Sequence, residues 1–189
     1  MKSIAVIGAG QFGTQVAVGL SQKGYDVVLL DKEEERVEEL KDMVGQAIVL
    51  DSLDEKAMRA VNIDHIDTAV VAIGTNVQAS LLTTALLQKL GIEDIYVRAI
   101  SPLQESILQS MGIENIINIE KEMGIQISNT ITDDRVGRYI ALSNRHSLME
   151  IKAPQSFVKK TLKELDVRQK YRINVVGIKT QKAEVSDKE

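Results

Sequence analysis

Short, nearly continuous apolar runs alternate with amphipathic segments along most of this chain. The runs are rich in Val and Ile, a pattern typical of strands that are buried on both faces of a parallel sheet. They predict strands at residues 4–7, 27–30, 47–50, 69–73, 95–100 and 116–119. The amphipathic segments predict helices at residues 12–23, 33–43, 55–61, 77–90 and 103–111.

Four glycines and one proline mark the ends of these predicted helices. Gly24, Gly45, Gly91 and Gly112 stand where helices should stop, which favours a residue that tolerates the left-handed conformation. Pro102 begins a helix, where its missing N–H costs little. Six strands alternating with five helices predict an α/β fold, a Rossmann-like doubly wound parallel sheet with strand order 3-2-1-4-5-6.

The pattern changes after residue 119. We expect amphipathic helices over residues 120–142, interrupted near Thr132-Asp133-Asp134, followed by a strand at 147–153, a helix at 156–165 and a strand at 173–179. We expect the polar end, 180–189, to be frayed. The predicted domains are a nucleotide-binding domain at 1–119, crossover helices at 120–143 and a short, incomplete α+β lobe at 144–189.

Composition excludes several classes of protein. A net charge of −4 with 3% aromatic residues argues against a nucleic-acid binder. No apolar span is long enough to cross a membrane, so we expect no direct membrane insertion. The chain contains no cysteine, which favours a cytoplasmic setting. Met1-Lys2-Ser3-Ile4 leads straight into a predicted strand, so we expect no signal peptide.

The strongest chemical signal is Gly8-Ala9-Gly10-Gln11-Phe12-Gly13 between the first strand and helix. A G-x-G-x-x-G motif in this context predicts a phosphate-binding loop. Gly8 permits the tight turn, Gly10 lets the backbone approach a pyrophosphate, and Gly13 lets the helix pack on the sheet. Backbone N–H groups at the start of the helix, from Gln11, should face the phosphates.

An acidic residue ends the second strand, as a dinucleotide site requires. Asp31 should accept hydrogen bonds from ribose hydroxyls and repel a 2′-phosphate, which disfavours NADP, whereas Lys32 weakens that discrimination. The alternative interpretation is a degenerate Rossmann fold that binds nothing.

Other polar residues follow strands that should end at the same edge of the sheet. Gly74-Thr75-Asn76 comes after strand 4, opposite the glycine loop, and Asn76 either contacts a ligand or only caps the next helix. Asp51-Ser52 ends strand 3, where the adenine edge of a ligand would lie. Asp51 could instead simply start the next helix.

A cation and an anion complete the candidate edge. Arg98 lies in a strand otherwise suited to burial, so it should meet a carboxylate or a phosphate. Glu120 follows strand 6 at the start of a helix, where an acid is favourable for its dipole alone. If Glu120 faces phosphates instead, it requires a bridging Na⁺ or Mg²⁺ ion.

The chain offers little else that could perform chemistry. The acidic residues between 33 and 39 predict a solvated helix face, and the two histidines have no metal-like spacing. The four tyrosines show no acid–base arrangement for hydride transfer. A nucleotide site without a catalytic partner indicates a sensor. The alternatives are a small NAD-dependent oxidoreductase or an NAD(H) redox-sensing module.

Together these segments resemble the cytosolic regulatory subunits of bacterial potassium uptake systems, the Trk/Ktr family with its regulator of K⁺ conductance (RCK) domain. The segments that carry the resemblance are the following: Val6-Ile7 with the glycine motif, Val71-Ala72-Ile73-Gly74 with Asn76-Val77-Gln78-Ala79-Ser80, Glu120-Lys121-Glu122-Met123-Gly124, and Lys163-Glu164-Leu165-Asp166-Val167-Arg168 with Tyr171 and Ile173-Asn174-Val175.

The resemblance implies a homodimer that assembles into an octameric ring under a membrane-embedded K⁺ channel-like subunit, at the inner face of the cell membrane. ATP would favour the active state and ADP the inactive one, and NAD(H) binds in some members. Glu120 would help to hold a cation beside the terminal phosphate, and the apolar stripe of residues 120–142 would form the dimer and ring contacts. The implied binding residues are Gly8, Gly10, Gln11, Phe12, Gly13, Asp31, Lys32, Asp51, Ser52, Ile73, Gly74, Asn76, Arg98 and Glu120.

Two features depart from the family pattern. ATP-gated members often carry Arg in place of Gln11, and Gln cannot neutralise a γ-phosphate, whereas Trk-type subunits with Gln there also suit NAD(H). The predicted C-terminal lobe is short. Many relatives bind cyclic di-AMP in that lobe, and Asp166, Arg168 and Asn174 match part of the pattern. We do not expect this binding in a lobe without its closing elements.

Overall fold

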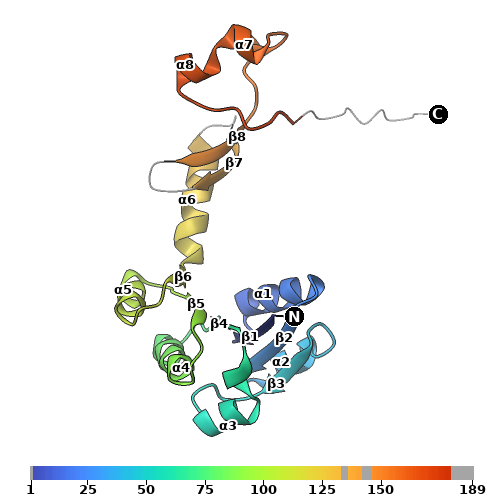
Figure 1. Ribbon diagram of the computed structural model, residues 1–189, viewed down its shortest axis with the longest axis vertical. Helices are drawn as coiled ribbons and strands as arrows, with labels where there is room; N and C mark the ends of the chain where they lie inside the picture. The colour runs from blue at the N-terminus through green and yellow to red at the C-terminus, as the bar shows by residue number, and fades with distance from the viewer. Residues whose placement is uncertain (1, 133–135, 142–145, 180–189) are drawn as a thin grey trace, which may run out of the picture. The chain divides into compact units, whose positions relative to one another are not determined.

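The structure, a computed structural model, describes residues 2–132, 136–141 and 146–179. The chain divides into two compact units, Met1–Ile125 and Gln126–Glu189. Both units are drawn in Figure 1, and the boundary between them falls within helix α6 (Ile119–Thr132).

The first unit is built on a six-stranded sheet whose strands are all parallel, in the order β3-β2-β1-β4-β5-β6. The predicted fold and strand order are confirmed. The strands are β1 (Ser3–Ile7), β2 (Asp26–Asp31), β3 (Gln46–Val49), β4 (Thr68–Val71), β5 (Asp94–Arg98) and β6 (Asn115–Ile117). The helices are α1 (Gln11–Gln22), α2 (Glu34–Leu40), α3 (Glu55–Ala60), η1 (Ile63–His65), α4 (Val77–Lys89) and α5 (Pro102–Ser110).

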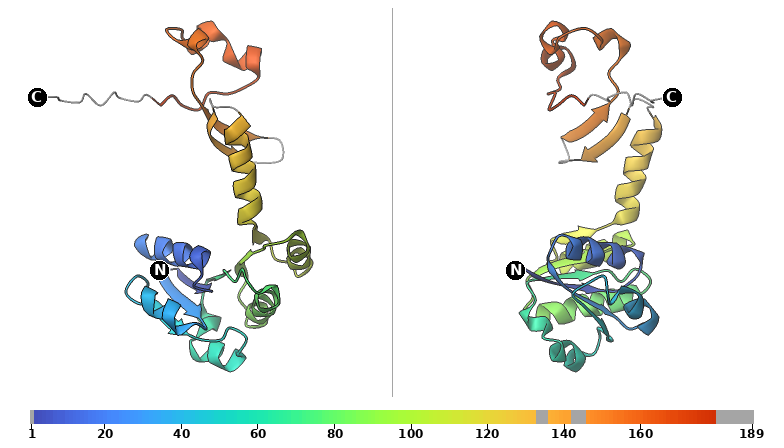
Figure 2. Two further views of the ribbon diagram at one scale, coloured as in Figure 1. Left: turned by 180° about the vertical axis from the view of Figure 1, so that it is seen from behind. Right: turned by 90° about the vertical axis from the view of Figure 1, so that its right-hand side faces the viewer.

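Helices cover both faces of this sheet (Figure 2). Alternate residues of a strand point to opposite faces, so β1 supplies both layers of the core. Ile4 and Val6 pack in the cluster that includes Ala17 of α1. Ala5 and Ile7 pack in the other cluster, which includes Leu87 of α4 and Leu108 of α5. The near-continuous apolar runs of the sequence are therefore those of strands buried on both faces.

The ends of the helices follow the predicted glycine and proline positions with one exception. Gly24, Gly91 and Gly112 have φ angles of +84°, +89° and +83°, as predicted for left-handed caps. Gly45 was wrongly predicted as such a cap, because its φ angle is not positive. A Cβ at position 45 would instead lie 3.1 Å from the Val27 carbonyl oxygen, so close packing against β2 favours glycine there. Pro102 begins α5, as predicted.

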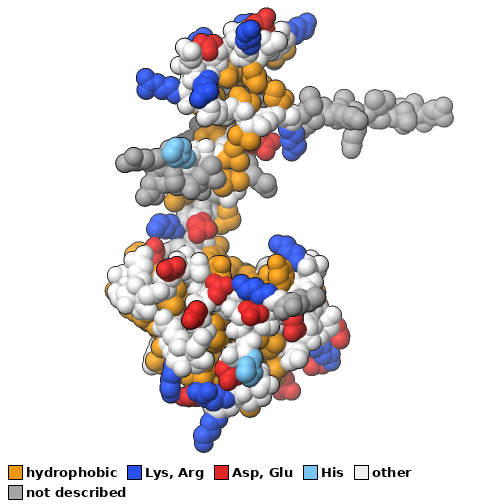
Figure 3. Space-filling view, in the orientation of Figure 1, with side chains coloured by type: hydrophobic (Ala, Val, Ile, Leu, Met, Phe, Trp, Pro, Cys, Tyr) orange, Lys and Arg blue, Asp and Glu red, His pale blue; other side chains and the backbone are white. Residues whose placement is uncertain are grey.

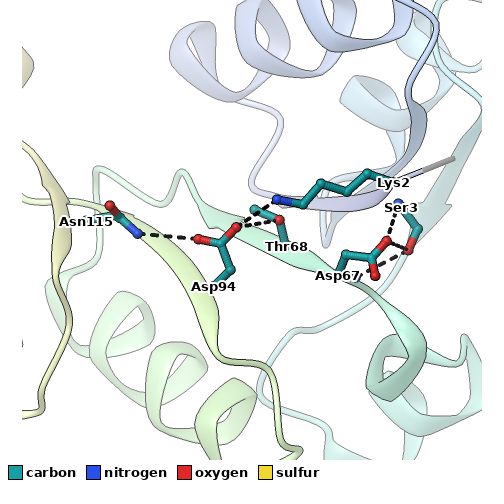
Figure 4. Close-up of polar contacts among 6 residues, drawn as sticks. All are labelled: Lys2, Ser3, Asp67, Thr68, Asp94 and Asn115. Atoms are coloured by element: carbon teal, nitrogen blue, oxygen red, sulfur yellow. Dashed lines mark hydrogen bonds and ion pairs between the residues drawn. The ribbon is translucent and has the colours of Figure 1, made fainter.

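A polar cluster ties the amino-terminal ends of the strands together (Figure 4). The carboxylate of Asp94 accepts hydrogen bonds from Lys2 Nζ at 2.9 Å, Thr68 Oγ1 at 2.7 Å and Asn115 Nδ2 at 3.4 Å. The Thr68 and Lys2 hydrogen bonds lower the pKa of Asp94 below its usual value. The cluster lies at the edge of the sheet opposite to the one where the glycine loop begins, and it joins β4, β5 and β6 to Lys2, the residue before β1.

In the second unit, β7 (Val136–Ala141) pairs antiparallel with β8 (Ser147–Ile151), with a register shift between Val136 and Arg138. The predicted strand at 147–153 is confirmed over Ser147–Ile151. The predicted helix over residues 136–142 is wrong in its described part. Val136, Tyr139 and Ile140 are β-branched or aromatic, and such side chains favour a strand once a partner strand is available. The predicted interruption at 133–134 lies outside the described residues.

The rest of the second unit departs further from the prediction. The predicted helix at 156–165 is split into η2 (Gln155–Phe157) and α7 (Leu162–Leu165). Lys159 between them has a φ angle of +63°, and a capping box of Thr161 and Glu164 starts a new helix. Helix α8 (Val167–Tyr171) was not predicted, and residues 173–179 are not a strand. The predicted frayed end, 180–189, lies outside the described residues.

Candidate functional site

The glycine loop joins the carboxyl end of β1 to the start of α1. Gly8 has a φ angle of +105°, and a Cβ there would lie 3.2 Å from the Ala72 carbonyl carbon. A Cβ at Gly13 would collide with the Gly8 carbonyl oxygen and lie 3.0 Å from Ala72 Cβ. A Cβ at Gly10 would meet no atom within 4 Å. Gly8 and Gly13 therefore serve the close packing of loop, helix and sheet, while the face of Gly10 is open.

Asp31, at the end of β2, is bonded to this loop. Its Oδ2 accepts the Ala9 N–H at 2.5 Å, and its Oδ1 accepts the Glu33 N–H at 2.9 Å. The Asp31 side chain is only 7% exposed. The carboxylate thus connects the β2 end with the glycine loop, besides lying where a ribose would be expected.

Two cationic side chains follow Asp31. Arg36 Nη1 lies 3.7 Å from Asp31 Oδ2, and its side chain is half exposed. Lys32 Nζ lies 3.7 Å from Glu33 Oε1 and is exposed. The ion pair between Arg36 and Asp31 was not predicted from the sequence. An arginine five residues after the strand-ending acid was the available signal.

Arg98, at the end of β5, lies over the loop that follows β4. A Cβ at Gly74 would come within 2.6 Å of Arg98 Nη1, so glycine is what allows the guanidinium to lie against this backbone. Arg98 Cζ lies 5.9 Å from the centroid of the Phe12 ring. Its Nε is buried without a hydrogen-bond partner. Three predicted site residues, Phe12, Gly74 and Arg98, are therefore brought together.

Glu120 neutralises Arg98. Arg98 Nη2 donates to Glu120 Oε1 at 2.6 Å, with side-chain exposures of 21% for Arg98 and 59% for Glu120. The hydrogen bond from its own backbone N–H, and then the bond from Arg98, lower the pKa of Glu120 below its usual value. The sequence predicted that Arg98 meets a carboxylate or a phosphate. In the structure its partner is the carboxylate of Glu120.

The remaining predicted residues have identified local partners. Asn76 Oδ1 accepts the Ala79 N–H at 2.9 Å and so caps α4. Asp51 is exposed and accepts the Leu53 N–H at 3.0 Å. Ser52 is buried and shares a 2.8 Å hydrogen bond with Thr83 of α4, so its hydroxyl faces the helix. Gln11 is exposed, and Ile73 packs against the core.

Neither a metal cluster nor a membrane span is apparent in the described part of the chain. Within it, no three His, Cys, Asp or Glu side chains are placed to share a metal ion. None of its helices combines the length and the apolar character that a bilayer crossing needs.

The TrkA-N domain model matches residues 4–119, which include all of the six-stranded sheet except Ser3 and every residue of the glycine loop. The chain belongs to the TrkA-N family. It is 39% identical over 178 residues to the Ktr system potassium uptake protein C of Bacillus subtilis, covering 94% of this chain and 80% of that protein. The Ktr system potassium uptake protein A of Vibrio alginolyticus is 33% identical over the same length, with 94% and 81% covered. Both relatives are potassium uptake proteins of Ktr systems.

The fold of this TrkA-N protein also matches a solved structure, the GsuK RCK domain, with a TM-score of 0.69 at 12% identity. That match covers 93% of this chain and 39% of the other. At this identity the likeness concerns the fold alone.

A buried polar network behind the TrkA-N site was not predicted. Gln104 of α5, 1% exposed, accepts the Ile100 N–H at 3.0 Å through Oε1. Its Nε2 donates to Ser80 Oγ of α4 at 3.2 Å and to the Arg98 carbonyl oxygen at 3.3 Å. This network fixes the backbone from Arg98, the last residue of β5, to Ile100 in the turn that follows. The spacing of Ser101 and Gln104 is typical of a helix start, but it does not indicate the hydrogen bonds from Gln104 to Ser80 and Arg98.

Proposed function

We propose that this protein is the nucleotide-gated regulatory subunit of a bacterial K⁺ uptake system. Its membership of the TrkA-N family and its Ktr relatives support the role in potassium transport. The observation that carries nucleotide binding is the open face of Gly10, where α1 begins and where a Cβ would meet no atom within 4 Å beyond Gly10 and its two chain neighbours. Unpaired N–H groups at the start of a helix attract phosphates there.

The proposed ligand is ATP or ADP, with NAD(H) as the alternative. The loop of Gly8, Gly10 and Gly13, with Gln11 at the helix start, would hold the phosphates. Asp31 would accept ribose hydroxyls, and Asp51, which is exposed at the end of β3, would contact the base. Both nucleotide classes carry an adenosine 2′-hydroxyl, so Asp31 serves either of them.

Arg98 and Glu120 would respond to the phosphates. A phosphate near Phe12 and Gly74 would compete with Glu120 for the Arg98 guanidinium, because both are anionic partners. A Na⁺ or Mg²⁺ ion beside the terminal phosphate would then take the place of Arg98 at Glu120. A γ-phosphate and its cation would thus change the contacts at this point, and a ligand shifts a conformational equilibrium only by such differences in binding.

We further propose that the chain forms a homodimer and an octameric ring that docks on a membrane-embedded K⁺ channel-like subunit at the cytoplasmic face. Hydrophobic side chains reach the surface of both units (Figure 3). Helix α6 alone exposes Met123 by 41%, Ile127 by 56% and Ile131 by 75%. Apolar residues at this spacing form one stripe of a helix, and burying it against a second copy would remove it from water.

A thermal-shift series tests the nucleotide proposal. The full chain is melted with ATP, ADP, NAD⁺, NADH or NADPH, each with and without Na⁺ or Mg²⁺. A ligand at one hundred times its dissociation constant adds about 2.7 kcal/mol of stability. We expect ATP and ADP to give different shifts that respond to the cation. A shift with NADH alone would replace ATP by NAD(H) as the ligand, and no shift with any nucleotide would refute the site.

The transport role has its own test. A membrane subunit of a Ktr-type system, reconstituted in liposomes, is assayed for K⁺ flux with and without this protein and with ATP or ADP. Flux that depends on the protein and differs between the nucleotides is expected. Flux that is indifferent to the protein would refute the regulatory role even if the nucleotide binds.

A further inference from the structure

The carboxylate of Asp31 forms a hydrogen bond with the backbone of the glycine loop itself. Ala9 N–H belongs to the loop that would bind phosphates, yet it points to Asp31 Oδ2 at 2.5 Å. This hydrogen bond is buried, and it spans the gap between the carboxyl ends of β1 and β2. An acid that served only to bind ribose would not need to hold this N–H.

The burial of Asp31 supports the same conclusion. Its side chain is 7% exposed, and each oxygen already accepts a backbone N–H, from Ala9 and from Glu33. Hydrogen bonds to an ionised acceptor are roughly twice as strong as neutral ones. Much of the bonding capacity of this carboxylate is therefore used inside the protein.

We propose that Asp31 is a positioning residue for the phosphate loop, in addition to its contact with ribose. Through Ala9, the carboxylate fixes the loop between Gly8 and Gly10 in the conformation that leaves the Gly10 face open. Part of the phosphate affinity therefore passes through Asp31, although Asp31 touches no phosphate. This proposal rests on the proposed nucleotide site.

The first test needs no ligand. Hydrogen–deuterium exchange of the ligand-free wild-type chain should show a protected Ala9 amide, although the acceptor of this amide is a side chain. In Asp31→Asn, exchange should rise in peptides that cover the loop, while peptides from β4 and β5 keep their protection. Arg36→Ala is the matched control, because it removes the 3.7 Å ion pair to the same oxygen and leaves both backbone hydrogen bonds. It should leave the loop unchanged.

The second test separates the loop from the ribose. Calorimetry measures ADP directly and adenosine by competition, for the wild type and for Asp31→Asn. A lost hydrogen bond to a charged group weakens binding by about 10- to 100-fold. A positioning role predicts that ADP loses more than adenosine, because only ADP uses the loop.

The outcomes are distinct. A rapidly exchanging Ala9 amide in the wild type overturns the proposal, and this readout holds even if Asp31→Asn fails to fold. Equal losses for ADP and adenosine with an unchanged loop would show that Asp31 acts on ribose alone. If the wild type binds neither ligand while the loop responds to Asp31→Asn, the nucleotide site fails and the loop contact stands.

Discussion

Substitution by alanine should have a different effect at each of Gly10, Gly13 and Gly19, and Gly13→Ala should lower the stability of the protein most. A Cβ at Gly13 would collide with the Gly8 carbonyl oxygen and lie 3.0 Å from Ala72 Cβ. Carbon atoms prefer separations of about 3.5–4.0 Å, so α1 must move away from the sheet. Overpacking of this kind costs about 1–3 kcal/mol.

Gly19 of the same helix provides the matched control. A Cβ there meets no atom within 4 Å, and alanine in a helix interior is about 0.5–1 kcal/mol more favourable than glycine. The free energy of unfolding, measured by urea denaturation, should therefore change in opposite directions. Gly13→Ala should be less stable than the wild type, and Gly19→Ala should be more stable. Equal stability of Gly13→Ala and wild type would refute the packing argument.

Gly10→Ala completes the series. Gly10 is the N-cap of α1 with extended backbone angles that alanine also adopts, so the variant should keep its stability to within about 1 kcal/mol. Its methyl group would enter the open space that we assign to phosphates, so affinity for ADP should fall. Unchanged affinity would mean that the phosphates do not lie over Gly10.

Three further predictions concern polar contacts. Thr83→Val leaves the buried Ser52 hydroxyl without its partner and should cost about 1–3 kcal/mol in urea denaturation, part of which Ser52→Ala in the same chain should restore. Arg98→Met should weaken ADP binding in calorimetry by about 10- to 100-fold, whereas retained affinity would exclude a phosphate contact. The folded-state pKa of Asp94 is lowered, so its contribution to stability is complete above a pH of about 4 and is lost as pH falls through that lower pKa. The free energy of unfolding, measured by denaturation between neutral and acid pH, should accordingly fall less steeply with decreasing pH in Asp94→Asn than in the wild type. An unchanged pH dependence would contradict this role.

The architecture of the first unit was predictable because its central strands, β1, β2 and β4, are buried on both faces. Runs such as residues 27–30 contain only apolar residues and are therefore easily identified as buried strands. The glycine motif identifies the edge of the sheet where strand 1 meets helix 1. The second unit gave weaker signals. The predicted helix over residues 136–142 is a strand in its described part. A few β-branched positions are compatible with the spacing of a helix or of a strand, and pairing with β8 stabilises the strand.

The candidate site was predictable as a set of residues but not as a set of contacts. Position relative to strand ends brought Gly74, Arg98 and Glu120 to one edge. That Gly74 makes room for the guanidinium, or that Asp31 holds Ala9, depends on distances that spacing does not encode. Ser52 is an example. Its position after β3 predicts that it lies next to the site, but its hydroxyl faces α4.

The central claim is that the glycine-loop edge binds an adenine nucleotide, and equilibrium dialysis of the full chain against radiolabelled ADP, ATP and NADH tests it most directly. We predict saturable binding of at least one of them in the micromolar range, lost in Gly10→Ala and kept in Gly19→Ala. Absence of binding by all three, or binding that Gly10→Ala leaves intact, would contradict the account.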